Sequence, residues 1–208
     1  MEFSKIYFDM DGVLADFDRG VWELCGMDSS LQNGQQDAAY DDRMWEKIRK
    51  VDHFYDRLEL MPGAKEMFDA LWGKYGDRVE ILTGVPKPKR GILTAGEDKI
   101  AWVRRNLSPD VRVNIVLRAE KIQYCTGPET VLIDDLERTV REWQEKGGTG
   151  ILYVSAEITL RTLREKEKAS DAASGMTIEQ ARDIEKVHNA MLGIVKEAAR
   201  KNQENRRR

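Results

Sequence analysis

Residues 6–17 read IYFDMDGVLADF, and this stretch decides how the rest of the chain is interpreted. The apolar run Ile6-Tyr7-Phe8 leads straight into Asp9, and Asp11 follows two residues later. Carboxylates at this density repel one another, so a soluble protein needs a reason to gather them at the end of a strand. Three explanations are open at this point: a surface charge cluster, a cation site, or the working end of an enzyme.

The composition is that of a globular protein. The chain has 208 residues, 41% hydrophobic and 34% charged, which fits one domain or one domain with a small subdomain. A net charge of −3 does not mark a nucleic-acid or membrane binder. No apolar run approaches the roughly 20 residues that cross a bilayer, and the first residues lack the apolar segment of a signal peptide. We therefore expect a cytoplasmic protein whose two cysteines, Cys25 and Cys125, are reduced.

Short apolar runs alternate with helix-like segments along the chain. We expect strands and helices in the following ranges: strands at 5–8, 78–83, 113–117, 130–134 and 150–154, and helices at 63–75, 97–107 and 137–148. This alternation predicts right-handed crossovers and a parallel sheet with helices on both faces. In such a sheet the ligand site lies beyond the carboxyl ends of the strands. Three expected strands end there in polar groups, at Asp9, Thr83 and Asp134.

Two parts of the chain do not follow this alternation. Segment 16–61 has no convincing strand and contains two helix-like stretches, which predicts a small helical cap inserted after the first strand. The core then comprises 1–15 and 62–154. Residues 155–208 are expected to form a C-terminal helical extension that ends in a basic tail. An apolar stripe over 178–198 either packs on the domain or forms a contact with a partner, such as a homodimer.

Four polar elements follow one another in the expected core. FDMDGV comes after the first strand, ILTG after the second, a lysine at position 121, and LIDD after a later strand. Asp9 is the candidate nucleophile, because a carboxylate can attack phosphorus to form an aspartyl-phosphate. Asp11 is the candidate general acid/base. Thr83 offers a hydroxyl to a phosphate oxygen, and Lys121 offers a charge that steadies phosphate and nucleophile, with Lys99 as a nearby competitor for that role.

Two carboxylates that face a phosphate dianion need a cation between them, and Mg²⁺ bound by oxygen ligands is suited to this task. Asp134 and Asp135 are placed to complete such a site. Gly12 removes side-chain bulk beside the metal, and Gly84 does so beside the phosphate. The sequence therefore predicts a Mg²⁺ site at the carboxyl edge of the sheet.

Together the four elements resemble the motifs of the haloacid dehalogenase superfamily of phosphatases, over roughly residues 5–154. The resemblance implies a Rossmann-like, three-layer core with Asp9 as nucleophile and Asp11 as acid/base. It also implies Mg²⁺ held by the Asp9 side chain, the Asp11 backbone carbonyl and Asp135. Asp134 would then be a supporting carboxylate, although which of Asp134 and Asp135 binds the metal directly stays open.

Four longer stretches are similar to the 5′(3′)-deoxyribonucleotidases: FDMDGVLADF, LELMPGAKEMFDAL, EDKIAWVRRNL and VLIDD. That family hydrolyses nucleoside monophosphates and carries a small helical cap. The resemblance implies a base pocket lined by Phe17, Trp45, Phe54 and Tyr55, whose rings stack on any nucleobase. One departure concerns the phosphate site: a serine commonly follows the second-motif threonine, and Gly84 stands there in this chain.

Two other functions stay open alongside a nucleotidase. One is a phosphatase for another small phosphate ester or a nucleic-acid 3′ end, which only the basic residues in loop 87–90 and the basic tail favour. The other is a non-catalytic nucleotide-binding or regulatory protein on the same scaffold. The intact set of catalytic groups argues against it. The preferred base and sugar, and the choice between 5′ and 3′ phosphate, stay open as well.

Overall fold

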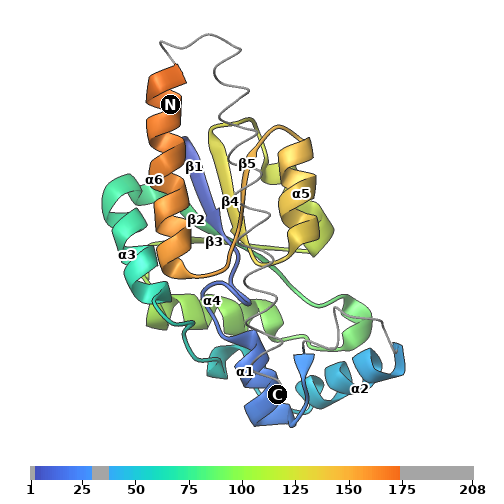
Figure 1. The fold of residues 1–208 in the computed structure, drawn as a ribbon. Coiled ribbons are helices and arrows are strands. Elements are labelled where there is room, and N and C mark those ends of the chain that lie inside the picture. Colours follow the sequence, from blue (N-terminus) through green and yellow to red (C-terminus); the bar gives the residue numbers. More distant parts are fainter. Residues whose placement is uncertain (1–2, 30–37, 174–208) are drawn as a thin grey trace, which may run out of the picture. The chain divides into compact units, whose positions relative to one another are not determined.

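A computed structural model describes residues 3–29 and 38–173 of the chain. One sheet of five parallel strands, in the order β3-β2-β1-β4-β5, forms its centre (Figure 1). The strands are β1 (Lys5–Phe8), β2 (Val79–Gly84), β3 (Arg112–Val116), β4 (Thr130–Asp134) and β5 (Thr149–Leu152). This arrangement confirms the predicted α/β fold class with a parallel, Rossmann-like sheet.

The helices connect and cover these strands. The α-helices are α1 (Phe17–Cys25), α2 (Ala38–Arg49), α3 (Ala64–Tyr75), α4 (Ala95–Asn106), α5 (Glu137–Glu145) and α6 (Ala156–Ala173). Short 3₁₀ helices are η2 (Phe54–Arg57), η3 (Gly76–Arg78), η4 (Pro88–Arg90) and η5 (Arg118–Tyr124). The helix predicted over 137–148 ends earlier, at Glu145, and Gly147 follows with φ +92°, a left-handed conformation that stops a helix.

The central strand β1 presents its side chains alternately to the two faces of the sheet. Ile6 and Phe8 belong to the larger core, where Phe8 packs against Phe68 of α3. Tyr7 points the other way and meets Trp143 of α5 edge to face. Helices α3 and α5 accordingly lie on opposite sides of the sheet (Figure 1). This period-2 pattern produces three layers: helix, sheet, helix.

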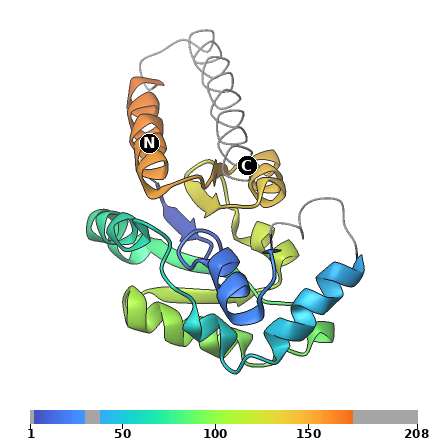
Figure 2. The ribbon, with the colours of Figure 1, turned by 60° about the horizontal axis from the view of Figure 1, so that its bottom comes forward.

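The predicted cap segment contains α1, α2 and η2, beyond the carboxyl ends of the strands (Figures 1 and 2). The chain enters and leaves it at one place, where Ala15 and Leu60 form an antiparallel bridge. The backbone N–H of Asp16 donates to the carbonyl of Glu59 at 2.8 Å beside that bridge. Asp16 also caps α1, because its Oδ1 accepts a hydrogen bond from the backbone N–H of Arg19.

The chain divides after Leu163 into two compact units. Leu160 and Leu163, in the first part of α6, pack into the same core as the sheet. The apolar stripe at 178–198, together with the partner contact predicted for it, lies outside the described residues. Among the helices that the structure describes, none is long and apolar enough to cross a membrane.

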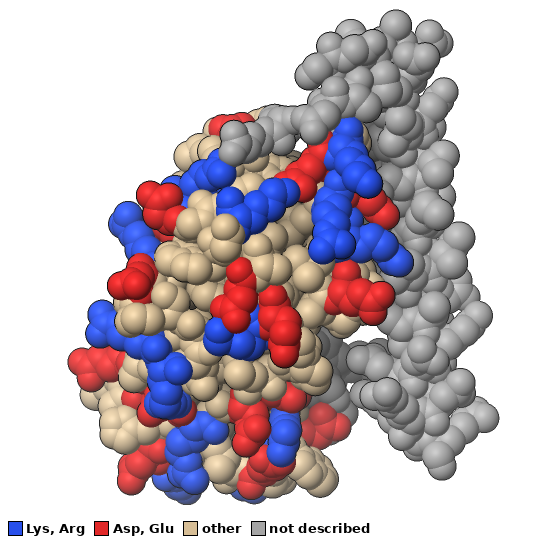
Figure 3. Space-filling model, turned by 90° about the vertical axis from the view of Figure 1, so that its left-hand side faces the viewer, with Lys and Arg blue, Asp and Glu red and all other residues tan. Residues whose placement is uncertain are grey.

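The surface carries charges of both signs. Figure 3 shows Lys and Arg side chains interspersed with Asp and Glu side chains over the described part of one face. Ion pairs between residues one helical turn apart, such as Lys65–Asp69 in α3 and Arg138–Glu142 in α5, also occur among the described helices. Exposed pairs of this kind contribute little to stability, so the fold depends on its buried interactions.

Cys25 and Cys125 are buried and free, in agreement with the expectation of reduced thiols. Cys125 lies in the smaller core beside Trp143, whose Nε1 donates to the carbonyl of Thr130 at 3.1 Å. Gly148 packs directly on this pair. A Cβ at Gly148 would lie 2.3 Å from Nε1 of Trp143 and 2.5 Å from Sγ of Cys125. The glycine is therefore needed for the close approach of β5 and α5.

We expect Gly148→Ala to lower the free energy of unfolding by about 1–3 kcal/mol, because the added methyl group overpacks the smaller core. The matched control is Gly73→Ala in α3, where an added Cβ would have no neighbouring atom within 4 Å. That variant should gain about 0.5–1 kcal/mol from helix propensity. Urea unfolding followed by circular dichroism measures both changes. Equal effects of the two substitutions would contradict the packing described here.

Candidate active site

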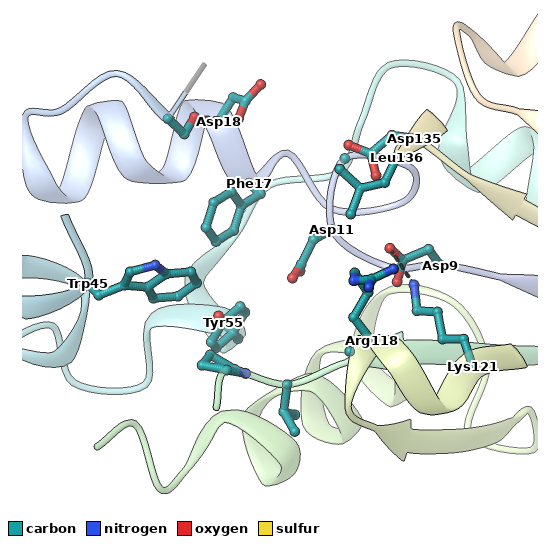
Figure 4. Close-up of a pocket in the computed structure, with 15 residues that line it drawn as sticks. Asp9, Asp11, Phe17, Asp18, Trp45, Tyr55, Arg118, Lys121, Asp135 and Leu136 are labelled. Atoms are coloured by element: carbon teal, nitrogen blue, oxygen red, sulfur yellow. Dashed lines mark hydrogen bonds and ion pairs between the residues drawn. The ribbon is translucent and has the colours of Figure 1, made fainter. Parts of the chain in front are cut away.

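A cavity of about 260 Å³ lies at the carboxyl edge of the sheet (Figure 4). Charged groups line one end of it, with Asp9, Asp11 and Lys121 among them. Aromatic rings line the other end, and Asp11 lies between the two groups in Figure 4. The cavity thus joins the ends of the strands to the helical segment above them.

Asp9 is held in place by the sheet and by Lys121. Its backbone N–H donates to the carbonyl of Ile133 at 2.8 Å, which continues the pairing of β1 with β4. Nζ of Lys121, on η5, lies 2.8 Å from Oδ2 of Asp9 and 2.7 Å from Oδ2 of Asp134. Burial by itself would lower the pKa of Lys121, but the carboxylates of Asp9 and Asp134 outweigh it and raise that pKa. Lys121 is therefore charged, although only 2% of its surface is exposed.

Asp134 and Asp135 have different surroundings. Both oxygens of Asp134 are engaged, Oδ2 with Lys121 and Oδ1 with the backbone N–H of Leu136 at 2.9 Å. Asp134 is fully buried, whereas Asp135 lines the cavity. Asp135 is exposed to the cavity, where reduced hydration and the carboxylates of Asp9 and Asp134 raise its pKa above the usual range of aspartate. A cation in the cavity would relieve this repulsion.

The residues at this end of the cavity fit a divalent cation. Asp9, Asp134 and Asp135 each offer a carboxylate oxygen, and these oxygens lie within 4.8 Å of one another. A Cβ at Gly12, which has φ +73°, would lie 2.3 Å from Oδ2 of Asp135, so only glycine leaves room beside that carboxylate. Oxygen ligands and excess negative charge are what Mg²⁺ sites in proteins provide.

A second buried lysine, Lys99 of α4, contacts the other candidate catalytic carboxylate. Its Nζ donates to Oδ2 of Asp11 at 2.7 Å, to Oγ1 of Thr83 at 2.9 Å and to the carbonyl of Gly84 at 2.7 Å. Thr83 is fully buried beneath this ammonium and does not line the cavity. The two lysines therefore do not compete for one position, since Lys121 pairs with Asp9 and Lys99 with Asp11.

The sequence indicates Lys99 only as a competitor for the role of Lys121 and does not predict its contact with Asp11. A usable signal was present, because Ala95, Lys99 and Val103 recur at intervals of four residues and all three are buried. Burial raises the pKa of Asp11, and the charge of Lys99 partly offsets that effect. The structure also adds Arg118 to the cavity wall, with its Nη1 3.0 Å from Oε2 of Glu142.

Three of the four predicted aromatic residues line the cavity. Phe17 stacks on Tyr55 with ring centroids 6.3 Å apart, and Trp45 lies 6.3 Å from Phe17. Phe54 lies outside the cavity lining, where it packs edge to face against Tyr55 at 5.2 Å. Phe54 therefore supports the aromatic wall from its buried side.

The basic loop before α4 contacts the helical segment through Arg90. Its guanidinium forms ion pairs with Asp41 and Asp42 of α2, and it lies 5.7 Å from the ring centroid of Trp45. Trp45 in turn donates from Nε1 to Oδ1 of Asp41 at 2.9 Å. In the sequence Arg90 is only one of the basic residues of loop 87–90. The structure instead shows it anchoring α2 and orienting an aromatic residue of the cavity.

A curated mouse protein has a related sequence. The mouse mitochondrial 5′(3′)-deoxyribonucleotidase is 29% identical over 153 residues, which cover 63% of this chain and 64% of that protein. The predicted resemblance is confirmed. The match spans less than two thirds of the relative's length, and no family model matches the chain.

Solved structures with a related arrangement have low sequence identity. A haloacid dehalogenase superfamily hydrolase from Ehrlichia chaffeensis has a TM-score of 0.48 and 16% identity, over 74% of this chain and 90% of that one. A haloacid dehalogenase family enzyme from Bacteroides thetaiotaomicron, solved as a magnesium complex, has a TM-score of 0.40 and 18% identity, over 74% of this chain and 94% of that one.

The aromatic wall is anchored to α4 through the turn at η2. Nδ1 of His53 lies 2.7 Å from Oδ1 of the buried Asp98, and Nη1 of Arg105 lies 2.6 Å from Oδ1 of Asp56. The hydrogen bond to Asp98, and then its charge, raise the pKa of His53. His53 also has φ +51°, a left-handed conformation that asparagine tolerates well.

We expect the His53–Asp98 pair to make stability pH-dependent. Because the folded-state pKa of His53 is raised, its contribution is fully present below the unfolded value of about 6.5 and is lost as pH rises through the folded value. The parent protein should therefore melt at a higher temperature than His53→Asn at pH 5.5, and the difference should disappear by pH 9. Thermal unfolding of both proteins across this range is the test. A difference that grows with pH would contradict it.

Proposed function

We propose that this protein is a Mg²⁺-dependent phosphatase that hydrolyses nucleoside monophosphates through an aspartyl-phosphate intermediate. The observation that carries the proposal is the division of the cavity into a charged end at Asp9 and Asp11 and an aromatic end at Phe17, Trp45 and Tyr55. A nucleotide has the same two-part chemistry, with an anionic phosphate at one end and a flat base at the other. The related deoxyribonucleotidase supports the same substrate class.

The aromatic end suits a nucleobase but selects weakly among bases. Phe17 and Tyr55 present stacked rings, and Trp45 lies beside Phe17. Stacking of a base on such rings contributes about 1–3 kcal/mol and tolerates any base. The cavity volume of about 260 Å³ is close to the lower end of small-ligand sites. A mononucleotide therefore fits this site better than a longer nucleic acid.

In the first chemical step the Asp9 carboxylate attacks phosphorus. A bond forms between a carboxylate oxygen of Asp9 and phosphorus, and the bond from phosphorus to the nucleoside oxygen breaks. Asp11 donates its proton to that leaving oxygen, so the nucleoside departs as a neutral alcohol. Lys121 holds Asp9 in position throughout, through the contact of 2.8 Å between Nζ and Oδ2.

In the second step Asp11, now a carboxylate, accepts a proton from water. The water oxygen forms a bond with phosphorus, and the bond to Asp9 breaks, which releases inorganic phosphate and regenerates both carboxyl groups. Arg118 lies in the cavity wall, where its positive charge faces the region that the phosphate occupies. The positive charges of Arg118 and Lys121 together favour a negatively charged transition state.

For the metal site we propose Asp9, the backbone carbonyl of Asp11 and Asp135 as the ligands. Asp135 lines the cavity, whereas both oxygens of Asp134 are already engaged by Lys121 and the N–H of Leu136. Asp134 then supports the site by fixing Lys121. Mg²⁺ held there would neutralise part of the phosphate charge.

The site should lose activity when its nucleophile or its metal is removed. We expect Asp9→Asn to abolish phosphate release from nucleoside monophosphates, and Asp11→Asn to lower it by about 10²–10⁴-fold. EDTA should stop the parent enzyme, and added Mg²⁺ should restore the parent but not Asp9→Asn. A colorimetric phosphate assay over all common nucleoside monophosphates measures these effects.

The matched control is Asp16→Asn, since Asp16 is an aspartate of the same segment that caps α1 and does not line the cavity. Asparagine is an equally good cap, so this variant should retain the parent's activity. Sugar phosphates serve as the substrate comparison. Hydrolysis by Asp9→Asn at the parent's rate would falsify the proposed mechanism, and a parent active only on sugar phosphates would exclude the nucleotide substrate.

Gly84 offers a gain-of-binding test of the phosphate end. A Cβ at this position would lie 3.6 Å from the backbone nitrogen of Arg118, an ordinary contact, so a serine fits. Its hydroxyl adds one hydrogen bond, worth about 0.5–1.5 kcal/mol, and we expect Gly84→Ser to lower KM roughly two- to tenfold. Gly84→Ala, which adds the carbon without the hydroxyl, is the control. Identical KM values for the two variants would show that the phosphate lies elsewhere.

A further inference from the structure

Lys99 is a buried ammonium group to which the proposed mechanism assigns no role. The side chain has 0% exposure, and the residue does not line the cavity. The ring of Tyr55 covers it, with Nζ 4.7 Å from the ring centroid. Burial of a lysine is costly unless its charge is paired and its hydrogen bonds are made. The structure therefore contains a specific reason for its position.

All three N–H donors of Lys99 are in use. They reach Oδ2 of Asp11, Oγ1 of Thr83 and the carbonyl of Gly84. An ammonium group has three donors and no more, so Lys99 has none left for a phosphate oxygen. Lys121 differs in this respect, because its contacts with Asp9 and Asp134 use two donors and it lines the cavity.

The contact with Asp11 is made to one oxygen only. Oδ2 is paired with Lys99, whereas Oδ1 is buried and has no hydrogen-bond partner among the residues that the structure describes. A buried acceptor without a partner is unusual in proteins, and it marks a group with a further task. Lys99 therefore fixes Asp11 through one oxygen, while the other oxygen is enclosed by protein and makes no hydrogen bond among the described residues.

We propose that Lys99 is a positioning residue for the general acid: it holds the carboxyl group of Asp11 by Oδ2, at the edge of the cavity where this group exchanges the proton with the leaving oxygen. The other two donors of Lys99 bind Oγ1 of Thr83 and the carbonyl of Gly84 at the end of β2. These contacts fix the Asp11 carboxylate relative to the sheet. Lys121 does the same for the nucleophile. The site thus assigns one buried lysine to each catalytic carboxylate. This inference rests on the proposed phosphatase function.

The leaving group reveals which step a residue assists. A phenolate of low pKa departs without protonation, whereas an alcohol or a weakly acidic phenol needs the proton from the acid. A series of aryl phosphates with phenols of rising pKa therefore measures acid catalysis, and kcat/KM reports the step in which the leaving group departs. The parent should show a shallow dependence on leaving-group pKa.

For Lys99→Met we expect a steep dependence. Its kcat/KM should fall by about 10²-fold or more for the least acidic phenol, the range for a lost general acid, and by less than about tenfold for p-nitrophenyl phosphate. Asp11→Asn should give the same steep dependence. Lys121→Met is the matched control: it removes the other buried lysine, and its loss should be uniform across the series because Asp9 acts on every substrate alike.

A uniform loss in Lys99→Met would overturn the inference, since a phosphate-binding or purely structural role lowers every rate by one factor. Circular dichroism and thermal unfolding check that each variant is folded. If Lys99→Met does not fold, Lys99→Gln takes its place, because the amide is polar but cannot supply the three donors of the ammonium group, and it should still show a steeper dependence than the parent. A parent that hydrolyses aryl phosphates but no nucleotide overturns the proposed substrate class alone, and the aryl series still decides the role of Lys99.

Discussion

The mutual repulsion of four carboxylates is the constraint on which the rest of this structure depends. Asp9, Asp11, Asp134 and Asp135 gather at one edge of the sheet. At ~4 Å two like charges repel by about 1 kcal/mol in water and by about 4 kcal/mol near a protein surface. Two buried ammonium groups offset part of this repulsion. A divalent cation in the cavity would offset more of it, so folding and metal binding would then answer the same electrostatic problem.

The two lysines come from elements that are distant in sequence from the aspartates they hold. Lys121 lies on η5, which follows β3, and Lys99 lies on α4, which follows β2. Both reach the edge of β1 because β1 lies between β2 and β4 in the sheet. The carboxylates can therefore approach one another only when the sheet and these two helical elements are in place. The site is assembled by the whole core and not by one loop.

The sequence reveals the aspartates because each follows an apolar run that can only be a buried strand. The same reasoning fails for Lys99, since a charged residue in a helix is ordinarily exposed and only its spacing from Ala95 and Val103 shows otherwise. It also fails for neighbouring aromatic residues. Phe54 and Tyr55 sit together in a 3₁₀ turn, and only Tyr55 lines the cavity.

Contacts between loops and helices were beyond sequence reasoning for a different reason. The ion pairs of Arg90 with α2 join residues almost fifty positions apart, and no local pattern encodes such a meeting. Local sequence preferences predict which helices and strands form, whereas the path of a loop is set by its contacts with residues that are distant in sequence. The residues at the charged end of the cavity were therefore easier to predict than the shape of the cavity.

The bridge between Ala15 and Leu60 has a consequence for how such a protein can diverge. The two crossings of the chain lie side by side, joined by hydrogen bonds from Asp16 to Glu59 and from Met61 to Leu14. A segment that begins and ends at adjacent points can change in length or sequence without moving the strands on either side. Asp9 and Asp11 lie before the bridge, and Lys99, Lys121, Asp134 and Asp135 lie after it. The aromatic end of the cavity can thus be remodelled by exchanging one insertion, while the charged end is inherited unchanged.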